Sequence, residues 1–282
     1  MKQGQCEIVP FDGPLGAEVR GVDLRFAQSG SILYIILAAF RQYSVLLFRE
    51  QQLSDERLAE VSEWFGPQYI PPPGLPVAGG SDQPRVVKIA NRDGGVGAVG
   101  PLPPHSDLQY MPVPPSATML YALQVPDSGG DTGFANLQWA YEELSPALRE
   151  RLTQLQGVVL NPFVEAGYGR SLSGVHQHYS AGKVAEFAHP VVRTHPDTGR
   201  RSLYFSPFVE KLLGDVGTHE ESELLQQLAQ HIDQPHLYHM HQWDAGDLLL
   251  WDNRCTNHKR EAFDTDQPRV MHRLEIAGTR PF

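Results

Sequence analysis

His105-Ser106-Asp107, together with His258 far downstream, is the stretch of sequence that decides the expected fold. Side chains at positions i and i+2 of a β-strand point to the same face, so His105 and Asp107 should face one metal ion while Ser106 points away. His258 would then approach from a second strand. Two histidines and one carboxylate form the facial ligand set of non-haem Fe(II) sites, which leaves coordination positions open for substrate chemistry and dioxygen. The pattern therefore predicts a folded-over β architecture around a metal.

Short strand-like segments separated by Pro/Gly turns make up most of the sequence. Turns such as Asp127-Ser128-Gly129-Gly130 and Asp197-Thr198-Gly199-Arg200 lie between them. Many short strands with peripheral helices are typical of a jelly roll, so we expect a mainly β fold with helices around it. The predicted strands are 44–48, 85–89, 117–123, 157–160, 202–205, 237–243, 247–251 and 270–276.

Four segments carry helix signals, and each begins with a capping residue or with acidic residues. A helix is predicted at 31–43 after Ser29 or Ser31, at 54–65 from Ser54, at 137–155 after Asn136, and at 218–232. Pro146 predicts a break in the third helix, with Ser145 capping its second half. The apolar run 32–40 is too short to span a bilayer, so it indicates a buried helix.

The length and composition favour one domain over residues 1–282. The chain has 282 residues, of which 41% are hydrophobic, enough for one large core. The segment from about 67 to 104 is rich in Pro and Gly, is interrupted by one predicted strand, and runs directly into His105. Long segments of this kind are often lids or binding loops, so we expect it to be lid-like.

The charge and the cysteine content narrow the partners and the compartment. The net charge of −10 and the pI of about 5.6 argue against nucleic acid or an anionic membrane as partner. An anionic small-molecule substrate would have to be bound by specific Arg or Lys residues. Cys6 and Cys255 do not form a disulfide framework, and the N-terminus has no apolar segment of a signal peptide. These features suit a reducing cytoplasm.

Four motifs in order resemble one known family. They are His105-Ser106-Asp107, Ser128-Gly129-Gly130-Asp131-Thr132, Trp251-Asp252-Asn253-Arg254-Cys255-Thr256-Asn257-His258 and Arg269-Val270-Met271-His272-Arg273. The series resembles the taurine dioxygenase and 2,4-dichlorophenoxyacetate dioxygenase family of Fe(II)/2-oxoglutarate oxygenases, from Gly16–Leu24 to Pro281-Phe282. The resemblance implies a double-stranded β-helix (cupin-like) core, Fe(II), 2-oxoglutarate as cosubstrate and O2. It also suggests a homo-oligomer, since relatives are often dimers or tetramers.

The resemblance also assigns roles to residues. It implies that His105, Asp107 and His258 bind iron, and that Arg269 grips the C5 carboxylate of 2-oxoglutarate with help from Thr132. A planar guanidinium can make this contact with two parallel hydrogen bonds. Arg273 would lie near the C1 carboxylate or an anionic group of the substrate. The implied reaction oxidises, most simply hydroxylates, an unactivated C–H bond and releases succinate and CO2.

Substrate recognition is less specified by the sequence. The candidates near the expected pocket are Tyr110, Asn91, Lys88, Phe208 and Tyr69, together with Arg273. The sequence departs from the taurine enzymes after Phe65-Gly66 and before His105, where it has Pro101-Leu102-Pro103-Pro104. A sulfonate, a carboxylate-bearing or a less charged substrate therefore stays open, and so does desaturation or ring formation in place of hydroxylation.

Two other functional classes also fit parts of the pattern. A cupin-like protein could hold a metal and a carboxylate without oxygen chemistry. A metal-dependent hydrolase on the same fold would need a general base near the metal, and it would not explain Arg269 together with Thr132.

Several conspicuous residues are interpreted structurally. Trp251 is expected to pack in the core beneath the site, Asp252-Asn253-Arg254 to form a supporting turn, and Cys255 to be a small buried residue. His272 should face away from the two arginines. We expect His239 and His241 on an exposed strand face, and His176 and His178 in a solvated loop.

Overall fold

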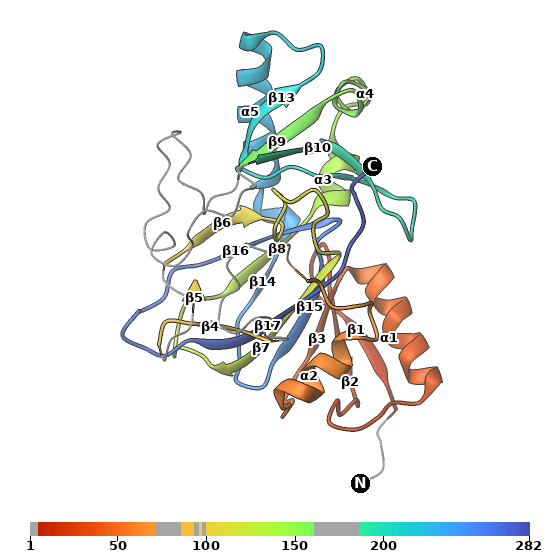
Figure 1. The fold of residues 1–282 in the computed structure, drawn as a ribbon, viewed down its shortest axis with the longest axis vertical. Helices are drawn as coiled ribbons and strands as arrows, with labels where there is room; N and C mark the ends of the chain where they lie inside the picture. The colour runs from red at the N-terminus through yellow and green to blue at the C-terminus, as the bar shows by residue number, and fades with distance from the viewer. Residues whose placement is uncertain (1–4, 71–85, 93–95, 98–99, 161–185) are drawn as a thin grey trace.

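The computed structural model describes residues 5–70, 86–92, 96–97, 100–160 and 186–282 of the chain. Its largest element is a mostly antiparallel eight-stranded sheet (Figure 1). Both ends of the chain supply neighbouring strands, as the separation of the motifs predicts. In spatial order the strands are β1 (Glu7–Pro10), β2 (Ala17–Arg20), β3 (Val45–Phe48), β15 (Leu248–Asp252), β7 (Ala117–Gln124), β17 (Val270–Ile276), β4 (Val87–Ala90) and β5 (Val96–Gly97).

A four-stranded sheet lies over the large one (Figure 1). It consists of β14 (Tyr238–His241), β8 (Thr132–Asn136), β16 (Thr256–Arg260) and β6 (Leu102–His105). Two packed sheets with strands from distant parts of the chain form the expected jelly-roll core. Smaller sheets combine β10 (Glu186–Pro190), β9 (Gln156–Leu160) and β13 (Val209–Leu213), and β11 (Val192–Thr194) with β12 (Arg201–Leu203).

Alternation along the strands of the large sheet separates two faces. Leu249, Trp251 and Met271 pack with Phe134 of β8 in the space between the sheets. Leu248 and Leu250, one position away, pack on the opposite face against the helices α1 (Gly30–Tyr43) and α2 (Asp55–Ser62). The odd-numbered residues of β17, among them Arg273 and Glu275, therefore point to the interior between the two sheets.

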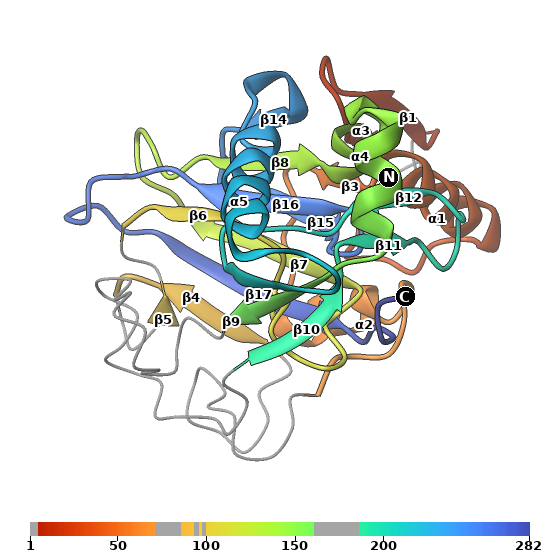
Figure 2. The ribbon, with the colours of Figure 1, turned by 90° about the horizontal axis from the view of Figure 1, so that it is seen from above.

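The helices begin where their capping residues predict. The side chains of Ser29, Ser54, Asn136 and Ser145 each accept a hydrogen bond from a backbone N–H of the first turn. The expected break at Pro146 separates α3 (Leu137–Glu143) from α4 (Pro146–Thr153). The last helix, α5 (Thr218–Ile232), has the predicted bounds, and it crosses the outer side of the smaller sheet (Figure 2).

Side chains of α5 and of the four-stranded sheet share a hydrophobic cluster. Leu228 and Ile232 pack there with Ala135 of β8 and Tyr238 of β14. Helices thus cover the outer faces of both sheets. In the described part of the chain, no helix is both long and apolar enough to cross a membrane.

The sequence analysis missed several strands that border the interior. It placed no strand at 132–136, 209–213 or 256–260, where the structure has β8, β13 and β16. The described part of the lid-like segment 67–104 contains β4, β5 and β6 rather than one strand. Residues 71–85, 93–95 and 98–99 of that segment, and the loop with His176 and His178, lie outside the described residues.

Candidate active site

His105, Asp107 and His258 converge at one end of the smaller sheet. His105 ends β6 and lies directly opposite His258 of β16 in the strand register. The candidate ligand atoms of the three side chains all lie within 4.8 Å of one another. His258 Nε2 is 3.8 Å from Asp107 Oδ1, and the two imidazole centroids are 4.2 Å apart. Two imidazoles and a carboxylate at this separation suit a non-haem Fe(II) ion.

The approach of Asp107 differs from the expected strand geometry. The strand stops at His105, and Asp107 belongs to the turn that follows, in which Leu108 has a φ of 48°. In this turn the Asp107 backbone N–H donates to the Asn253 side chain, with its nitrogen 3.4 Å from Oδ1. Ser106 faces away as expected, since its hydroxyl donates to the Thr256 carbonyl. A turn, rather than alternation along one strand, therefore brings Asp107 to the histidines.

Burial prepares both imidazoles for metal binding, and a hydrogen bond does so for His105. His105 Nδ1 lies 2.8 Å from the Pro103 carbonyl oxygen. A proton on Nδ1 satisfies that carbonyl and leaves the Nε2 lone pair for a metal. Burial lowers the pKa of His105, and burial followed by the nearby His105 lowers the pKa of His258 to about 3. Both rings are therefore neutral at physiological pH, the state in which imidazole binds metals.

The Asp107 carboxylate is fixed from behind by a buried polar network. The Thr118 hydroxyl donates to Asp107 Oδ2 over 2.7 Å, and Asn253 Nδ2 donates to the Thr118 oxygen over 2.8 Å. Trp251 Nε1 donates to Asn253 Oδ1, while the Trp251 ring packs 4.8 Å from the His258 ring, centroid to centroid. Trp251 and Asn253 thus support the site, as the sequence predicts for them.

Opposing effects act on the ionisation of Asp107. Burial alone would raise the pKa of this carboxyl. Interactions with His258, Arg273 and His105, with the hydrogen bond from Thr118, outweigh burial and hold the pKa of Asp107 below its ordinary value. Asp107 is therefore a carboxylate and supplies an anionic ligand atom.

Arg269 provides a buried cation in the same interior. The residue is 2% exposed, and among the described residues its Nε has no hydrogen-bond partner. Its guanidinium carbon lies 5.9 Å from the centroid of the Phe263 ring. Burial, followed by the charge of Arg260, lowers the pKa of Arg269 to about 9, so the side chain is still a cation at neutral pH. A buried cation with an unsatisfied donor fits the carboxylate of a bound anion.

Backbone and side-chain contacts hold Arg269 in place. Gly130 has a φ of +71°, and a Cβ atom at this position would lie 3.3 Å from Arg269 Nε. The turn before β8 therefore passes close to the guanidinium because residue 130 is glycine. The Asn91 side chain accepts a hydrogen bond from the Arg269 backbone N–H and donates to the carbonyls of Thr265 and Gln267.

Thr132 lies on the inner side of β8 with its hydroxyl available as a donor. It is 3% exposed, and its oxygen accepts a hydrogen bond from Trp243 Nε1 over 2.9 Å. The hydroxyl proton can therefore point to another acceptor. Nothing in the local sequence identified Trp243 as its partner, because that contact joins residues 111 positions apart.

Arg273 reaches the metal-binding cluster from the large sheet. Its Nη1 lies 3.7 Å from Asp107 Oδ1, and its Nη2 lies 3.2 Å from Oε1 of Glu275. Burial raises the pKa of Glu275 and Arg273 opposes that effect. The sequence analysis missed Glu275, although its position two residues after Arg273 on the same strand face is a signal that could have identified it.

Of the other candidate substrate-binding residues, Phe208 contacts a candidate ligand, whereas Tyr69 and Tyr110 have other neighbours. The Phe208 ring meets the His105 ring edge-on, with centroids 6.1 Å apart. Tyr69 donates its backbone N–H to the Glu275 carbonyl, and burial raises the pKa of its phenol, with the charge of Glu275 adding to the effect. Tyr110 is buried in the hydrophobic cluster that also includes α3 and α5.

Asn91 and Lys88 are not brought to the metal-binding cluster. Asn91 uses its amide to hold the backbone around Arg269. Lys88 is opposite His272 in the register of β4 and β17, so the two share a face. His272 Nδ1 contacts Asp55 Oδ1 of α2 at 2.6 Å, on the face away from Arg273. This orientation of His272 is the expected one, and it turns Lys88 away from the interior.

The expectation of an exposed face for His239 and His241 is wrong. His241 is 2% exposed, and its Nε2 lies 3.0 Å from Asp247 Oδ2. The His239 ring stacks on Phe11 with centroids 4.1 Å apart, and burial lowers its pKa to about 4. Side chains alternate between the two faces of β14, so Met240, which lies between His239 and His241, is the exposed one.

A second cluster that brings His195, Asp252 and Cys255 together is structural. Asp252 accepts hydrogen bonds from two nitrogens of the Arg254 guanidinium and lies 3.0 Å from His195 Nε2. Burial raises the pKa of the Cys255 thiol, which then stays protonated. Arg254 already pairs with the Asp252 carboxylate that a metal ion would need as a ligand, so this cluster has a structural role.

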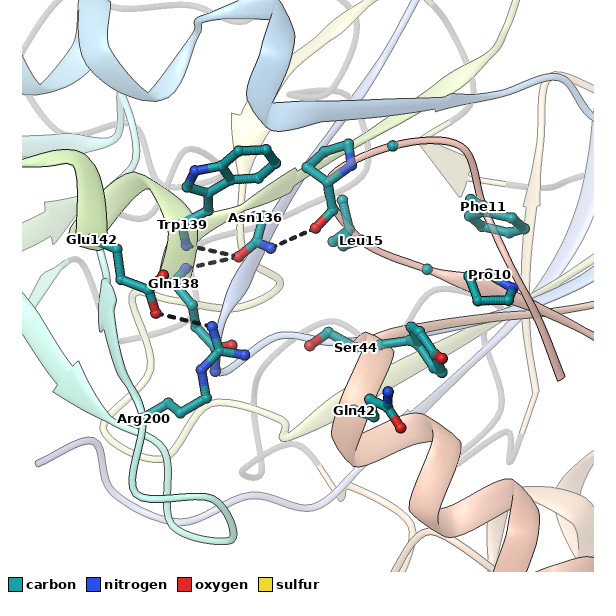
Figure 3. A pocket seen from close by; sticks show the side chains of 14 residues that line it. Pro10, Phe11, Leu15, Gln42, Ser44, Asn136, Gln138, Trp139, Glu142 and Arg200 are labelled. Carbon is teal, nitrogen blue, oxygen red and sulfur yellow. Dashed lines mark hydrogen bonds and ion pairs between the residues drawn. The ribbon is translucent and has the colours of Figure 1, made fainter.

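A polar cavity of about 340 Å³ opens elsewhere on the molecule. It lies between the turn that joins β1 and β2, the end of α1 and the beginning of α3, with Arg200 and Glu142 paired at one edge (Figure 3). None of His105, Asp107 and His258 lines it. The cavity is therefore separate from the site described above.

Comparisons with known proteins identify the family. The family described as "Taurine catabolism dioxygenase TauD, TfdA family" matches residues 7–274. The chain is 32% identical over 284 residues to an (S)-phenoxypropionate/alpha-ketoglutarate-dioxygenase of Sphingobium herbicidovorans, covering 96% of this chain and 95% of that protein.

Solved structures agree with the sequence match. A taurine dioxygenase from Burkholderia xenovorans superposes with a TM-score of 0.81 at 32% identity, covering 98% of this chain and 90% of that one. AAD-2 in complex with Mn(II) and N-oxalylglycine superposes with a TM-score of 0.78 at 28% identity, covering 98% and 99%. The chain belongs to the taurine catabolism dioxygenase TauD, TfdA family and is an Fe(II)- and 2-oxoglutarate-dependent dioxygenase.

Proposed function

We propose that this dioxygenase hydroxylates an unactivated C–H bond of a small substrate that carries an anionic group. His105, Asp107 and His258 would hold Fe(II), and Arg269 with Thr132 would bind the C5 carboxylate of 2-oxoglutarate. The observation that carries this proposal is the convergence of the three candidate ligands, within 4.8 Å, in one interior with the buried Arg269. The bound metal and cosubstrate supply the oxidising chemistry, with release of succinate and CO2.

The residues of the chain would bind, orient and exclude water. The neutral imidazoles and the anionic Asp107 present three ligand atoms together, and Thr118 fixes the carboxylate. Thr132 and Arg269 are almost completely buried, so a carboxylate held between them is shielded from solvent. Charge-assisted hydrogen bonds are stronger in such a site than in water.

Arg273 is the side chain that we propose for the anionic group of the substrate or for the C1 carboxylate. It is partly exposed, at 26% for its side chain, while it contacts Asp107. Two similar proteins are named for phenoxypropionate and taurine, which both carry an acidic group. Phe208, Tyr69 and Tyr110 are the candidates for the substrate-facing wall, and Asn91 and Lys88 are better explained as supports.

The test is 2-oxoglutarate turnover with a panel of anionic substrates. Aryloxyalkanoates, sulfonates and sulfate esters are each mixed with enzyme, Fe(II), 2-oxoglutarate and O2, and succinate is measured. We expect substrate-stimulated succinate formation that disappears in Asp107→Ala and persists in Asp12→Ala, which removes an exposed carboxylate. Full turnover in Asp107→Ala, with its fold verified by circular dichroism, would refute the ligand assignment.

We also propose a cytoplasmic single-domain protein that assembles as a homodimer or homotetramer. Exposed large aromatic side chains support assembly, since Phe26 is 53% and Tyr34 of α1 is 72% exposed. Light scattering coupled to size-exclusion chromatography tests this directly. A monomeric mass at micromolar concentration would contradict the proposed assembly.

A further inference from the structure

Trp243 lies between the two sheets, next to the hydroxyl proposed for the cosubstrate. It follows β14 by two residues, and it is 9% exposed. Its Nε1 donates to the Thr132 oxygen over 2.9 Å, although the two residues are 111 positions apart. Its ring packs with Phe134 of β8 and Leu249 of β15 in the cluster between the sheets. The indole N–H therefore reaches a buried hydroxyl from within the core.

The hydrogen bond from Trp243 limits what the Thr132 hydroxyl can do. A threonine hydroxyl has one proton to donate and two lone pairs that accept. Because the indole N–H is only a donor, this contact uses a lone pair of Thr132 and leaves its proton unused. Threonine is also stiff at χ1, so its oxygen has few positions. The Thr132 proton is thereby kept for an acceptor other than Trp243.

A buried network holds the indole ring in place. His241 lies directly opposite Thr132 in the register of β14 and β8. The His241 ring meets the Trp243 ring edge-on, with centroids 4.8 Å apart and planes at 88°. His241 Nε2 lies 3.0 Å from Asp247 Oδ2, and Arg49 Nη1 lies 3.1 Å from the same oxygen. The buried His241, itself anchored to Asp247, therefore supports the indole beside Thr132.

We propose that Trp243 is a positioning residue for 2-oxoglutarate, because it holds the Thr132 hydroxyl with its proton directed to the C5 carboxylate. This inference rests on the proposed function, in which Thr132 and Arg269 bind that carboxylate. The turn before β8 passes beside Arg269, since a Cβ atom at Gly130 would lie 3.3 Å from its Nε. A hydroxyl that is already oriented loses less freedom when a ligand binds, so the affinity is higher.

The alternative is that Trp243 only fills space between the sheets. Its ring is large, and Phe134 and Trp251 pack in the same cluster. Loss of a purely packing residue would loosen this interior, and it would weaken the binding of metal and of every keto acid alike. A residue that acts through the Thr132 hydroxyl would affect only ligands that reach this hydroxyl, and only while the hydroxyl is present.

The experiment measures keto-acid binding to the Mn(II)-loaded protein by isothermal titration calorimetry. It compares 2-oxoglutarate with 2-oxovalerate, a keto acid of the same length without the far carboxylate, and Mn(II) binding is measured alone. Trp243→Phe keeps an aromatic ring and removes the N–H. Trp64→Phe is the matched control, because Trp64 packs in the cluster on the other face of the large sheet. Thr132→Val and the double variant complete a double-mutant cycle.

We expect Trp243→Phe to weaken 2-oxoglutarate binding by about three- to tenfold, the range of a neutral hydrogen bond. The affinities for Mn(II) and 2-oxovalerate should change less than about twofold, and Trp64→Phe should resemble the wild type. Thr132→Val should weaken 2-oxoglutarate binding by about ten- to a hundredfold, as for a hydrogen bond to a charged group. Adding Trp243→Phe to Thr132→Val should then change the affinity less than about twofold, because the indole has no hydroxyl left to position.

His241→Gln gives an independent measure, which also applies if Trp243→Phe does not fold. It removes the ring that packs against the indole and keeps an amide donor near Asp247. We expect it to weaken the binding of 2-oxoglutarate by at least about twofold and to leave that of 2-oxovalerate unchanged. Equal losses for both keto acids in either variant would overturn the inference.

Two further outcomes would also overturn it. One is an unchanged affinity for 2-oxoglutarate in Trp243→Phe, and the other is the same loss from Trp243→Phe whether residue 132 is threonine or valine. Failure of the proposed function would look different, since the wild-type protein itself would not bind 2-oxoglutarate in the presence of Mn(II).

Discussion

Replacing Thr118 by valine should weaken metal binding although Thr118 is not a candidate ligand. The Thr118 hydroxyl donates to Asp107 Oδ2 over 2.7 Å, and both residues are at most 4% exposed. Valine keeps the shape and removes the donor, and it also leaves Asn253 Nδ2 without the oxygen to which it donates. The carboxylate would then lose the contact that fixes its orientation toward the two histidines.

The expected size of this effect follows from two independent magnitudes. Removing a hydrogen bond to a buried charged group costs about 1.5–3 kcal/mol. Losing a partner that orients a metal ligand weakens metal affinity by about 10- to 100-fold. A tenfold change in affinity corresponds to about 1.4 kcal/mol, so the two ranges agree. We therefore expect Mn(II) to bind to Thr118→Val about 10- to 100-fold more weakly.

The assay is a titration of the metal-free protein with Mn(II), followed by electron paramagnetic resonance of the unbound ion. Ser62→Ala is the control, because it also removes a buried hydroxyl, which donates to the Ala59 carbonyl in α2 on the other side of the large sheet. Turnover of Thr118→Val should recover at saturating Fe(II). Mn(II) affinity equal to that of the wild type, or the same loss in Ser62→Ala, would refute the orienting role.

Two further perturbations test the cosubstrate region and the core. Gly130→Ala should raise the KM for 2-oxoglutarate by at least about tenfold in a steady-state assay, because a Cβ 3.3 Å from Arg269 Nε displaces the guanidinium. Gly199→Ala is the control. Gly199 has a similar φ of +70° but open space around it, so this variant should leave the KM unchanged. In His189→Gln, the free energy of unfolding should fall less between pH 7 and pH 4.5 than it does in the wild type. The reason is that burial lowers the pKa of His189 to about 4, which outweighs the contact of the ring with the Met111 carbonyl. The pKa of His189 in the folded protein lies below its unfolded value of about 6.5. The free energy of unfolding is therefore unaffected by this residue above about pH 6.5, and it falls by up to about 3 kcal/mol as the pH drops toward and below 4. Urea unfolding at pH 7 and pH 4.5 measures this, and parallel losses in wild type and variant would contradict it.

Local signals explain why the helices could be predicted from the sequence. Each cap acts within three residues, so Ser54 and Ser145 mark helix starts without knowledge of the rest of the fold. The central strands β3, β7 and β15 of the large sheet were also foreseen, because their apolar residues bury both faces. By contrast, β8 and β16 carry Thr132, His258 and Arg260 toward the interior, and this polar content hides the apolar pattern on which strand prediction depends.

The candidate ligands could be predicted as residue types, whereas their supports could not. His105 and His258 stand out by motif, but their pairing is a matter of register between β6 and β16. Thr118 of β7 and Asn253, in the turn after β15, reach Asp107 only once the chain has folded. No spacing along the chain encodes these contacts, since they join residues 11 and 146 positions apart.

The charge distribution explains why ligand recognition must depend on contact. The chain as a whole carries a charge of −10, which would repel an anionic cosubstrate at long range. At physiological ionic strength this field is screened beyond about 8 Å, so it sets the approach rather than the affinity. Inside the core, Arg269 is almost fully buried, and a cation in that position is costly until an anion pairs with it. The cost of burying this guanidinium therefore becomes selectivity, because a ligand with a negative charge at the right place relieves it and a neutral ligand does not.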